Sequence, residues 1–317
     1  MSYVLVGNYG VGNLGDEALR ISLEHLVPEA HFRVISANPG PDELPRLPCG
    51  IRSFLLTPWW KTVGALVRSD GLVFGGGALF TDVESSRACI LLAIHAFIAL
   101  LLRRPIFLAF QGIGPFRRRW TEAIVRSVVR WARFVSVRDA ASRARVESWG
   151  LSKNVVQTFD PVFSLFTEHN ADVRTQNVIV IIPRHNSPLP FFGWVAEHLG
   201  SDARGVRVLL LEPDHPGEQA IALSLPTLLP CRTTVIPIRT VDDLIRWTAG
   251  VRLVLTQRYH GALAGLAAAQ ETKVFPQLDD DKLAALGGFL EDSLASRRII
   301  QDLLLRGTQE LRTAMGL

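Results

Sequence analysis

Cysteine is scarce in this chain of 317 residues. Cys49, Cys89 and Cys231 lie far apart, and no C-x-x-C pair occurs. This spacing argues against a disulfide framework and against a cysteine-based zinc site, and it favours a reducing compartment. We therefore expect neither a metal nor a cofactor in this protein.

We also expect neither a leader nor a membrane-spanning segment. The N-terminus passes from Met1-Ser2 directly into the apolar stretch 3–6, without a basic segment or a small-residue cleavage site. The most apolar run, 88–102, is shorter than the roughly 20 residues that span a bilayer and has His95 in its middle. We interpret this run as a buried helix with a hydrogen-bonded core histidine. The expected location is the cytoplasm.

A strong charge bias is missing as well. Lys and Arg number 34 against 30 Asp and Glu, which gives a net charge of +4. Such a small excess does not indicate nucleic-acid binding, so we expect no nucleic-acid partner. The apolar content of 48% predicts well-filled cores, and the length exceeds that of a typical single domain.

Short apolar strands alternate with helices along both halves of the chain. Strands are expected at 3–7, 31–36, 70–74, 105–110, 134–137, 155–159, 177–182, 206–211, 233–237, 253–255 and 272–275. Helices are expected between them, the first at 18–26, and the polar segment 167–176 is the best linker. The alternation predicts an α/β protein with two Rossmann-like domains that face each other across a ligand-binding cleft. We assign 1–168 to the N-terminal domain, 177–298 to the C-terminal domain and 299–317 to a helix that crosses back.

Glycines cluster after three expected strands of the first half. A run of three glycines after a buried strand indicates that something approaches the backbone closely. Because parallel strands open at the same edge of a sheet, we predict that these glycine loops line the cleft. The residues concerned are Gly12, Asn13, Gly15, Gly75, Gly76, Gly77, Gly112 and Gly114.

The first glycine loop departs from a dinucleotide-binding fingerprint. Gly10, Gly12 and Gly15 fit G-x-G-x-x-G, but Asp16 and Glu17 follow at once, and a carboxylate would repel a pyrophosphate. Two interpretations stay open. The acids complement the dipole of the helix that begins here, or Asp16 meets a hydroxyl-bearing acceptor.

Charged side chains follow the strands of the second half. Arg184, Glu212, Arg258 and His260 stand at expected strand ends, and the first half adds Arg138. Guanidinium groups bind phosphate and carboxylate bidentately, and histidine exchanges a proton near neutral pH. A helix of small residues follows His260, and its N-terminus offers free N–H groups. The pattern predicts a site for a small polyanion, although an interdomain ion pair stays open for Arg184.

Six motifs in order along the chain resemble those of the polysaccharide pyruvyl transferases. They are Gly-Asn-Leu-Gly-Asp-Glu-Ala at 12–18, Phe-Gly-Gly-Gly at 74–77, Gln-Gly-Ile-Gly-Pro at 111–115, Val-Arg-Asp-Ala-Ala-Ser at 137–142, Asp-Pro-Val-Phe at 160–163 and Arg-Tyr-His-Gly-Ala at 258–262. The pair Asp281-Lys282 is similar to the family's C-terminal lysine position. No single motif is very specific, whereas the ordered set is.

The resemblance implies a GT-B-like fold with phosphoenolpyruvate as the donor. The implied reaction forms a pyruvate ketal on a sugar of a cell-surface polysaccharide, such as a cell-wall glycan, or of its lipid-linked precursor, and releases phosphate. The N-terminal domain would take the acceptor and the C-terminal domain the donor.

The resemblance also suggests roles for individual residues. His260 would donate the proton, and Arg258 and Arg138 would hold the phosphate and carboxylate groups. Arg184 and Lys282 would add contacts to the donor, and Asp16 would act at the acceptor. For Lys282, a place in a solvated acidic loop stays open.

Two other functions compete with this one. A GT-B nucleotide-sugar glycosyltransferase would share the fold and an anion site, and a non-catalytic anion sensor could dispense with the proton donor. A lipid-linked acceptor would place the protein at the inner face of the membrane. The segments 59–61, 103–104 and 117–120 combine basic and aromatic residues, and they form either a peripheral membrane contact or ordinary helix ends and turns.

Overall fold

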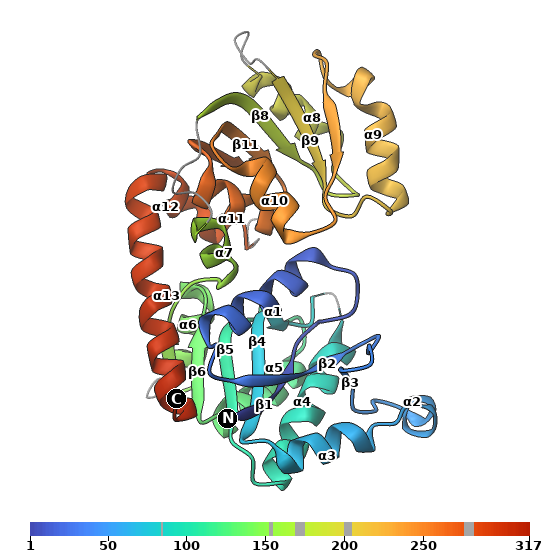
Figure 1. The fold of residues 1–317 in the computed structure, drawn as a ribbon, viewed down its shortest axis with the longest axis vertical. Coiled ribbons are helices and arrows are strands. Elements are labelled where there is room, and N and C mark those ends of the chain that lie inside the picture. The colour runs from blue at the N-terminus through green and yellow to red at the C-terminus, as the bar shows by residue number, and fades with distance from the viewer. Residues whose placement is uncertain (84, 152–154, 169–174, 200–204, 276–281) are drawn as a thin grey trace. The chain divides into compact units, whose positions relative to one another are not determined.

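The computed structural model describes residues 1–83, 85–151, 155–168, 175–199, 205–275 and 282–317. The chain forms two compact units (Figure 1). Unit 1 comprises 1–161 and 300–317, and unit 2 comprises 162–299. Most of the expected linker, 169–174, lies outside the described residues. The two units are described separately below.

Unit 1 is built on a parallel seven-stranded sheet with the order β3-β2-β1-β4-β5-β6-β7. The strands are β1 (Ser2–Val6), β2 (His31–Ser36), β3 (Leu44–Pro45), β4 (Gly71–Phe80), β5 (Ile106–Ile113), β6 (Phe134–Val137) and β7 (Val155–Gln157). The strand order reverses between β1 and β4, and ligands of open α/β sheets bind at the carboxyl ends of strands at such a switch point.

The helices of unit 1 cover both faces of this sheet. They are α1 (Leu14–Leu26), α2 (Ile51–Leu56), α3 (Trp60–Arg68), α4 (Ser86–Leu101), α5 (Arg119–Trp131), α6 (Ala140–Ser148) and the part of α13 (Ser293–Met315) from residue 300 onward. In α5, Thr121, Val125, Val128 and Val129 are buried, which is the spacing of a helix with one apolar stripe.

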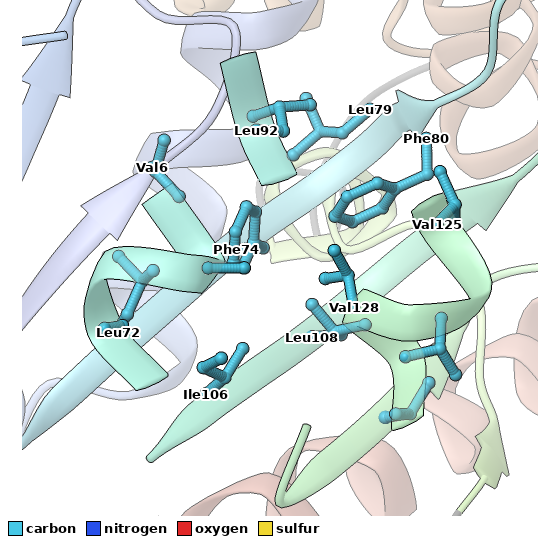
Figure 2. Packing of buried hydrophobic residues seen from close by; sticks show 14 of the residues in the cluster. Val6, Leu72, Phe74, Leu79, Phe80, Leu92, Ile106, Leu108, Val125 and Val128 are labelled. Carbon is cyan, nitrogen blue, oxygen red and sulfur yellow. The ribbon is translucent and has the colours of Figure 1, made fainter. Parts of the chain in front are cut away.

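The core of unit 1 lies between the sheet and helices α3, α4 and α5 (Figure 2). Leu72 and Phe74 of β4 point to the same face because successive strand residues alternate, and they pack beside Leu108 of β5. Each of these three side chains is 0% exposed. Continuous apolar strands are typical of parallel sheets that are buried on both faces.

Unit 2 repeats the architecture with a five-stranded parallel sheet of order β10-β9-β8-β11-β12. Its strands are β8 (Gln176–Ile182), β9 (Gly205–Leu210), β10 (Thr234–Pro237), β11 (Val251–Thr256) and β12 (Glu271–Val274). Its helices are α7 (Val162–Glu168), α8 (Leu189–His198), α9 (Pro216–Leu228), α10 (Val241–Thr248), α11 (Tyr259–Ala268), α12 (Gly287–Leu290) and the start of α13, with a 3-10 turn at Ala284–Leu286. The predicted α/β fold with two Rossmann-like units is confirmed, and the switch point of unit 2 lies between β8 and β11.

Several expected glycine loops are strand interiors instead. Gly75, Gly76 and Gly77 lie inside β4, and Gly112 lies inside β5. A Cβ atom on Gly76 or Gly77 would come within 2.8 Å of a methyl group of Leu19 in α1. The positive φ angles of 74° and 82° at these two glycines also favour residues without a side chain. The close approach that the sequence indicates is made by the protein's own side chains.

The first helix begins earlier than the sequence suggested. It starts at Leu14 rather than at residue 18, because the Asn13 side chain caps it by accepting a hydrogen bond from the Gly15 N–H at 2.9 Å. Asp16 and Glu17 therefore lie in its first turn, where carboxylates complement the helix dipole.

Helix α4 only partly fits the expected buried helix. His95 is 0% exposed and hydrogen-bonded, as predicted: its Nε2 accepts from the Leu47 N–H at 3.0 Å, and its Nδ1 lies 2.7 Å from the Leu91 carbonyl oxygen. Phe97 and Leu101, near the end of the helix, nevertheless remain 47% and 62% exposed. None of the helices in the described ranges is long and apolar enough to cross a membrane.

Burial should make His95 a source of acid sensitivity. Burial lowers its pKa from 6.5 to about 4, so the unfolded chain binds a proton between these values that the folded protein does not. The free energy of unfolding should therefore fall as the pH drops from 6.5 towards 4, by about 2 kcal/mol between neutral pH and pH 5. Urea denaturation of wild type and His95→Gln at both pH values tests this. Equal pH dependence of the two proteins would contradict it.

Candidate active site at the switch point of unit 2

The candidate site lies at the carboxyl ends of β8 and β11. Strand β8 leads into Pro183, Arg184 and His185, and β11 leads into Gln257 and Arg258. The two strands pair in parallel, with Ile182 opposite Thr256, so both exits lie at the same edge of the sheet. This is the edge at which the sequence places the anion site.

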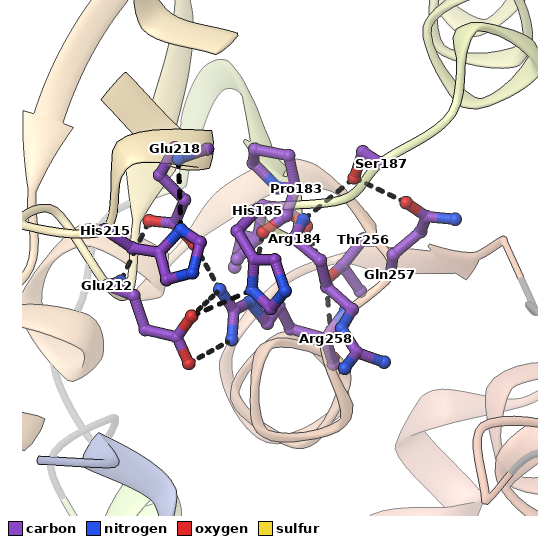
Figure 3. A network of polar contacts seen from close by, with 12 residues as sticks. Pro183, Arg184, His185, Ser187, Glu212, His215, Glu218, Thr256, Gln257 and Arg258 are labelled. Atoms are coloured by element: carbon purple, nitrogen blue, oxygen red, sulfur yellow. Dashed lines mark hydrogen bonds and ion pairs between the residues drawn. The ribbon is translucent and has the colours of Figure 1, made fainter. Parts of the chain in front are cut away.

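Arg258 is held in place by its backbone and its side chain. As the N-cap residue of α11, it donates its backbone N–H to the Thr256 hydroxyl at 2.9 Å. Its Nε donates to the Pro183 carbonyl at 3.1 Å. Its two terminal nitrogens bond the two carboxylate oxygens of Glu212 at 3.0 and 3.1 Å, and one of them also pairs with Glu218. The guanidinium therefore links β8, β11 and α9 (Figure 3).

Glu212 and Glu218 form the acidic side of this network. Glu218 lies in the first turn of α9, is 0% exposed and accepts a hydrogen bond from the Glu212 N–H at 2.8 Å. Hydrogen bonds from Arg258 lower the pKa of Glu212 to about 2, against the opposing effect of burial, and His185 contributes in the same direction. Both terminal nitrogens of Arg258 are thus paired with carboxylates.

Two histidines that the sequence analysis gave no role flank the network. The rings of His185 and His215 stack with their centroids 4.2 Å apart, and His185 Nδ1 lies 3.1 Å from a Glu212 oxygen. His215 Nδ1 accepts the Gly217 N–H at 3.0 Å, which caps α9. Their positions in the sequence could have indicated a role, because His185 follows a strand end and His215 precedes a helix.

The loop after β8 is fastened to the end of β11. The Arg184 N–H donates to the Ser187 hydroxyl at 2.8 Å, and this hydroxyl donates to Gln257 Oε1 at 2.5 Å. These bonds fix the backbone from which the Arg184 side chain extends. Arg184 and Arg258 thus stand on adjacent strand ends (Figure 3).

His260 and Lys282 lie on the α11 side of the site. His260 is in the first turn of α11 and half-buried, and its ring meets the Tyr259 ring edge-on at 5.5 Å between centroids. Lys282 Nζ lies 5.8 Å from the centre of the Tyr259 ring. Unit 2 therefore gathers Arg184, Arg258, His260 and Lys282, whereas Asp281 lies outside the described residues.

Small residues let α11 pack tightly against the sheet. A Cβ atom on Gly261 would lie 2.8 Å from the Thr256 hydroxyl and 3.0 Å from Ile182, and one on Gly265 would lie 3.0 Å from Val254. The small residues of α11 therefore allow the helix to approach the sheet closely. The N-terminus of the helix, which begins at Tyr259, is therefore fixed against the sheet.

Arg138 belongs to unit 1. It follows β6, is 5% exposed, and donates to Asp160 at 2.8 Å, with the Asp139 carboxylate 3.7 Å away. Gly112 makes room for it, because a Cβ atom there would lie 3.0 Å from Arg138 Nε. Its predicted contact with the donor remains untested.

The glycine loop after β1 is ordered by polar contacts within unit 1. Asn8 Nδ2 donates to Asp16 at 3.0 Å, and the Gly10 N–H donates to Glu17 at 2.9 Å. No described heavy atom outside its chain neighbours lies within 4 Å of a Cβ built on Gly12, so this loop is open there. Gly114 also follows a strand, and Arg145 packs against it. Both interpretations of Asp16 remain compatible with these contacts.

A metal site would need several ligating side chains close together among the residues that the structure describes. Within them, no group of three or more His, Cys, Asp and Glu side chains has an arrangement that would hold a metal ion.

Removal of Arg258 should destabilise unit 2. Arg258→Ala leaves Glu212 and the buried Glu218 without their cation, and loss of one partner of a buried ion pair costs about 3–5 kcal/mol. Arg239→Ala is the matched control, because Arg239 also binds a carboxylate bidentately, that of Asp214, but on the surface. Denaturation of both variants should show a large loss only for Arg258→Ala. Similar losses would contradict a structural role for the network.

Glu212 should contribute to stability in a defined acid range. Its pKa is about 2 in the folded protein against an ordinary 4.5, so its contribution is complete above pH 4.5 and is lost as the pH falls towards 2. Glu212→Gln should flatten the pH dependence of the unfolding free energy over this range. Chemical denaturation at several pH values measures it, and an unchanged slope would show that Glu212 is not stabilised by Arg258.

Comparisons with known proteins bear on the family and the fold of the chain. A family model described as polysaccharide pyruvyl transferase matches residues 13–270. No curated protein gives a significant match.

Several solved structures share the fold. The Anabaena protein Alr3699/HepE in complex with UDP and glucose is 14% identical, with a TM-score of 0.57 over 100% of this chain and 97% of that one. The UDP-GlcNAc 2-epimerase of Methanocaldococcus jannaschii is 10% identical, with a TM-score of 0.59 over 100% and 99%. A putative UDP-N-acetylglucosamine 2-epimerase from Listeria monocytogenes is 12% identical, with a TM-score of 0.57 over 99% and 91%. At these identities the likeness concerns the fold, which is of the GT-B type.

Proposed function

The chain belongs to the polysaccharide pyruvyl transferase family, and we propose that it transfers a pyruvyl group from phosphoenolpyruvate to a sugar, forming a cyclic ketal. The acceptor is a sugar of a cell-surface polysaccharide or of its lipid-linked precursor, and phosphate is released. Phosphoenolpyruvate serves as a substrate, and no cofactor takes part. The protein acts in the cytoplasm, at the inner face of the membrane when the acceptor is lipid-linked.

The observation that carries this proposal is the cationic cluster of unit 2. His260 lies in the first turn of α11, Lys282 lies over the Tyr259 ring of the same turn, and Arg184 follows the strand end beside it. Backbone N–H groups and the helix dipole favour an anion at this N-terminus. Arg258 joins them at the strand edge, already fixed by Glu212 and Glu218. Phosphoenolpyruvate carries a phosphate and a carboxylate, which this set of donors suits.

The pairing of Arg258 refines its proposed role. Its guanidinium makes four hydrogen bonds within the protein, to Pro183, Glu212 and Glu218. We assign it to fixing the start of α11 and to adding positive charge near the donor. The direct ionic contacts to the donor then fall mainly to Arg184 and Lys282.

His260 is assigned to proton transfer. Protonated His260 gives its proton to the methylene carbon of phosphoenolpyruvate, which makes a methyl group and leaves C2 electron-deficient. One sugar hydroxyl attacks C2 and the second closes the ring, while the C2–O bond to phosphate breaks. Of the two hydroxyl protons, one returns to His260 and the other leaves with the phosphate. Atoms and charge therefore balance, and the imidazole is ready for another cycle.

The acceptor is assigned to unit 1. Asp16 stands at the N-terminus of α1, at the switch point between β1 and β4, with the open Gly12 beside it. A carboxylate at this place can accept a hydrogen bond from a sugar hydroxyl and increase its nucleophilicity. The Asn8 amide holds this carboxylate in place. Arg138 is buried against Asp160 in the same unit. We propose that it also binds the donor, as the family resemblance implies.

A nucleotide-sugar glycosyltransferase is the second candidate. Alr3699/HepE, which shares the fold, was solved with UDP and glucose, and the same chain architecture can hold a nucleotide sugar. A nucleoside diphosphate would use the same cationic groups. The two functions differ in the ligand that binds without an acceptor present.

Ligand-induced stabilisation separates the two functions. Phosphoenolpyruvate should raise the melting temperature of the wild type, because a ligand that binds only the folded state adds about 2.7 kcal/mol at a hundredfold excess over its Kd. The shift should be lost in Arg184→Ala and Lys282→Ala and kept in Lys273→Ala, whose cation pairs with Glu271 on β12. A shift with UDP-glucose and none with phosphoenolpyruvate would replace the pyruvyl transfer proposal with the glycosyltransferase.

Substitution of His260 separates catalysis from binding. His260→Gln should keep the phosphoenolpyruvate-induced shift and lose about 100- to 10,000-fold in phosphate release measured with glycans extracted from the source cells. Asp16→Asn, in the other unit, should likewise keep the shift. A His260→Gln variant that releases phosphate at the wild-type rate would exclude His260 as the proton donor, and a wild type that binds but releases none would favour an anion sensor.

A further inference from the structure

Helix α2 of unit 1 is an apolar helix with no buried residue. Ile51 is 82% exposed, Leu55 and Leu56 are each 72% exposed, and Phe54 is 54% exposed. Burial of such side chains is the dominant favourable term in folding, so a short helix that exposes all of them is unusual in a soluble unit. The exposed apolar side chains of α2 therefore indicate a binding partner that covers them.

The apolar surface continues onto the next helix. Trp60, the first residue of α3, is 61% exposed, and Leu101 at the end of α4 is 62% exposed. The Arg104 side chain donates to the Val67 carbonyl, which joins the end of α4 to the end of α3. We call the exposed residues Ile51, Phe54, Leu55, Leu56 and Trp60 the α2–α3 surface. It lies on helices α2 and α3 (Figure 1).

Aromatic rings fix the turn between the two helices. The rings of Phe54 and Trp59 lie 5.2 Å apart, those of Trp59 and Trp60 lie 6.4 Å apart, and Trp59 Nε1 donates to the Phe54 carbonyl at 3.0 Å. Tryptophan is enriched at membrane–water interfaces, where its ring meets the acyl region and its N–H remains polar. The surface therefore has a preformed aromatic element.

The charge around this surface has one sign. Residues 44–69 contain no Asp or Glu but include Arg46, Arg52, Lys61 and Arg68, of which the last three are exposed. The acid-free stretch 85–121, which includes α4, adds Arg103 and Arg104 next to Leu101. The chain as a whole has nearly balanced charge, so this concentration is local. An anionic partner complements it.

We propose that unit 1 docks on an anionic lipid bilayer through the α2–α3 surface. A short helix with exposed Leu, Ile, Phe and Trp residues and flanking Arg and Lys side chains matches the pattern of interfacial helices that lie in the plane of a membrane. A second copy of this chain would bring the same basic side chains against each other, which disfavours it as the occupant. The apolar residues enter the headgroup region, and Arg52, Lys61 and Arg68 contact lipid phosphates.

A hollow adjoins this surface, and one of its lining residues contacts the start of the loop assigned to the acceptor. The hollow has a volume of about 450 Å³ and is lined by residues that include Arg46, Leu56 and Pro58. Arg46 in turn donates to Asn8 Oδ1 at 3.3 Å and to the Tyr9 carbonyl at 3.4 Å. A lipid-linked acceptor that reached unit 1 from the bilayer would arrive beside this loop. This last step rests on the proposed function, whereas the docking itself does not.

The test is co-sedimentation of the full chain with vesicles. Wild-type protein should bind vesicles that contain phosphatidylglycerol, bind those of pure phosphatidylcholine much more weakly, and dissociate as the salt concentration rises. Leu55→Ser with Leu56→Ser should lower the partition coefficient at least about tenfold. Leu223→Ser with Leu294→Ser is the matched control, because these leucines are 84% and 73% exposed in unit 2, and it should bind like the wild type.

A second pair of variants tests the charge. Arg52→Gln should reduce the partition coefficient about fivefold on anionic vesicles, and Arg298→Gln, at an exposed arginine of unit 2, should leave it unchanged. All variants should keep the wild-type melting temperature and its phosphoenolpyruvate-induced shift. These two readouts keep a failure of docking separate from a failure of folding or of donor binding.

Three outcomes would overturn the proposal. Wild-type protein that stays in the supernatant with anionic vesicles excludes the bilayer. Equal binding by wild type and the Leu55/Leu56 double variant excludes the α2–α3 surface. A wild-type dimer that becomes monomeric only in the Leu55/Leu56 double variant, without vesicle binding, identifies a second copy of the chain as the occupant.

Discussion

The ion-pair network around Arg258 is the interaction on which unit 2 depends. One guanidinium joins the carbonyl of Pro183 after β8, Glu212 after β9 and Glu218 in α9, while its own backbone begins α11. Glu218 is fully buried, and a buried carboxylate is tolerated only when a cation and hydrogen bonds compensate for its lost hydration. The network therefore links the ends of β8, β9 and β11 with the N-termini of α9 and α11 at one edge of the sheet.

This network also sets the charge that a ligand meets. Arg258 is neutralised in part by two carboxylates, so its contribution to an anion site is smaller than its charge alone suggests. The remaining positive character comes from Arg184, Lys282 and the N-terminus of α11. Groups fixed before the ligand arrives need little reorganisation during reaction, which is the main source of electrostatic catalysis. Burial of the Glu218 carboxylate costs folding free energy, but its pairing with Arg258 makes this edge of the sheet rigid.

Unit 1 uses its glycines differently. In β4 they make room for side chains of the same unit: Leu19 packs over Gly76 and Gly77, and the Tyr9 hydroxyl donates to the Gly75 carbonyl at 2.8 Å. This packing fixes α1 and the loop before it against the sheet. The loop is open at Gly12, and several exposed apolar residues of the unit lie on α2 and α3. The loop around Gly12 and Asp16 and the α2–α3 surface are separate features of unit 1.

The sequence by itself determined the fold class, the positions of most strands and the membership of His95 in the core, because apolar periodicity and glycine placement depend on neighbouring residues. It also located Arg184, Arg258 and His260 just beyond strand ends, since the short apolar stretches that precede them predict strands. Tertiary structure alone decided which groups pair. Glu218 and His215 meet Arg258 and His185 only because β9 and α9 lie beside β8, and Arg138 is engaged by Asp160 from another strand end. Pairing across a sheet depends on strand order and on burial, and neither is encoded in the spacing of residues along the chain.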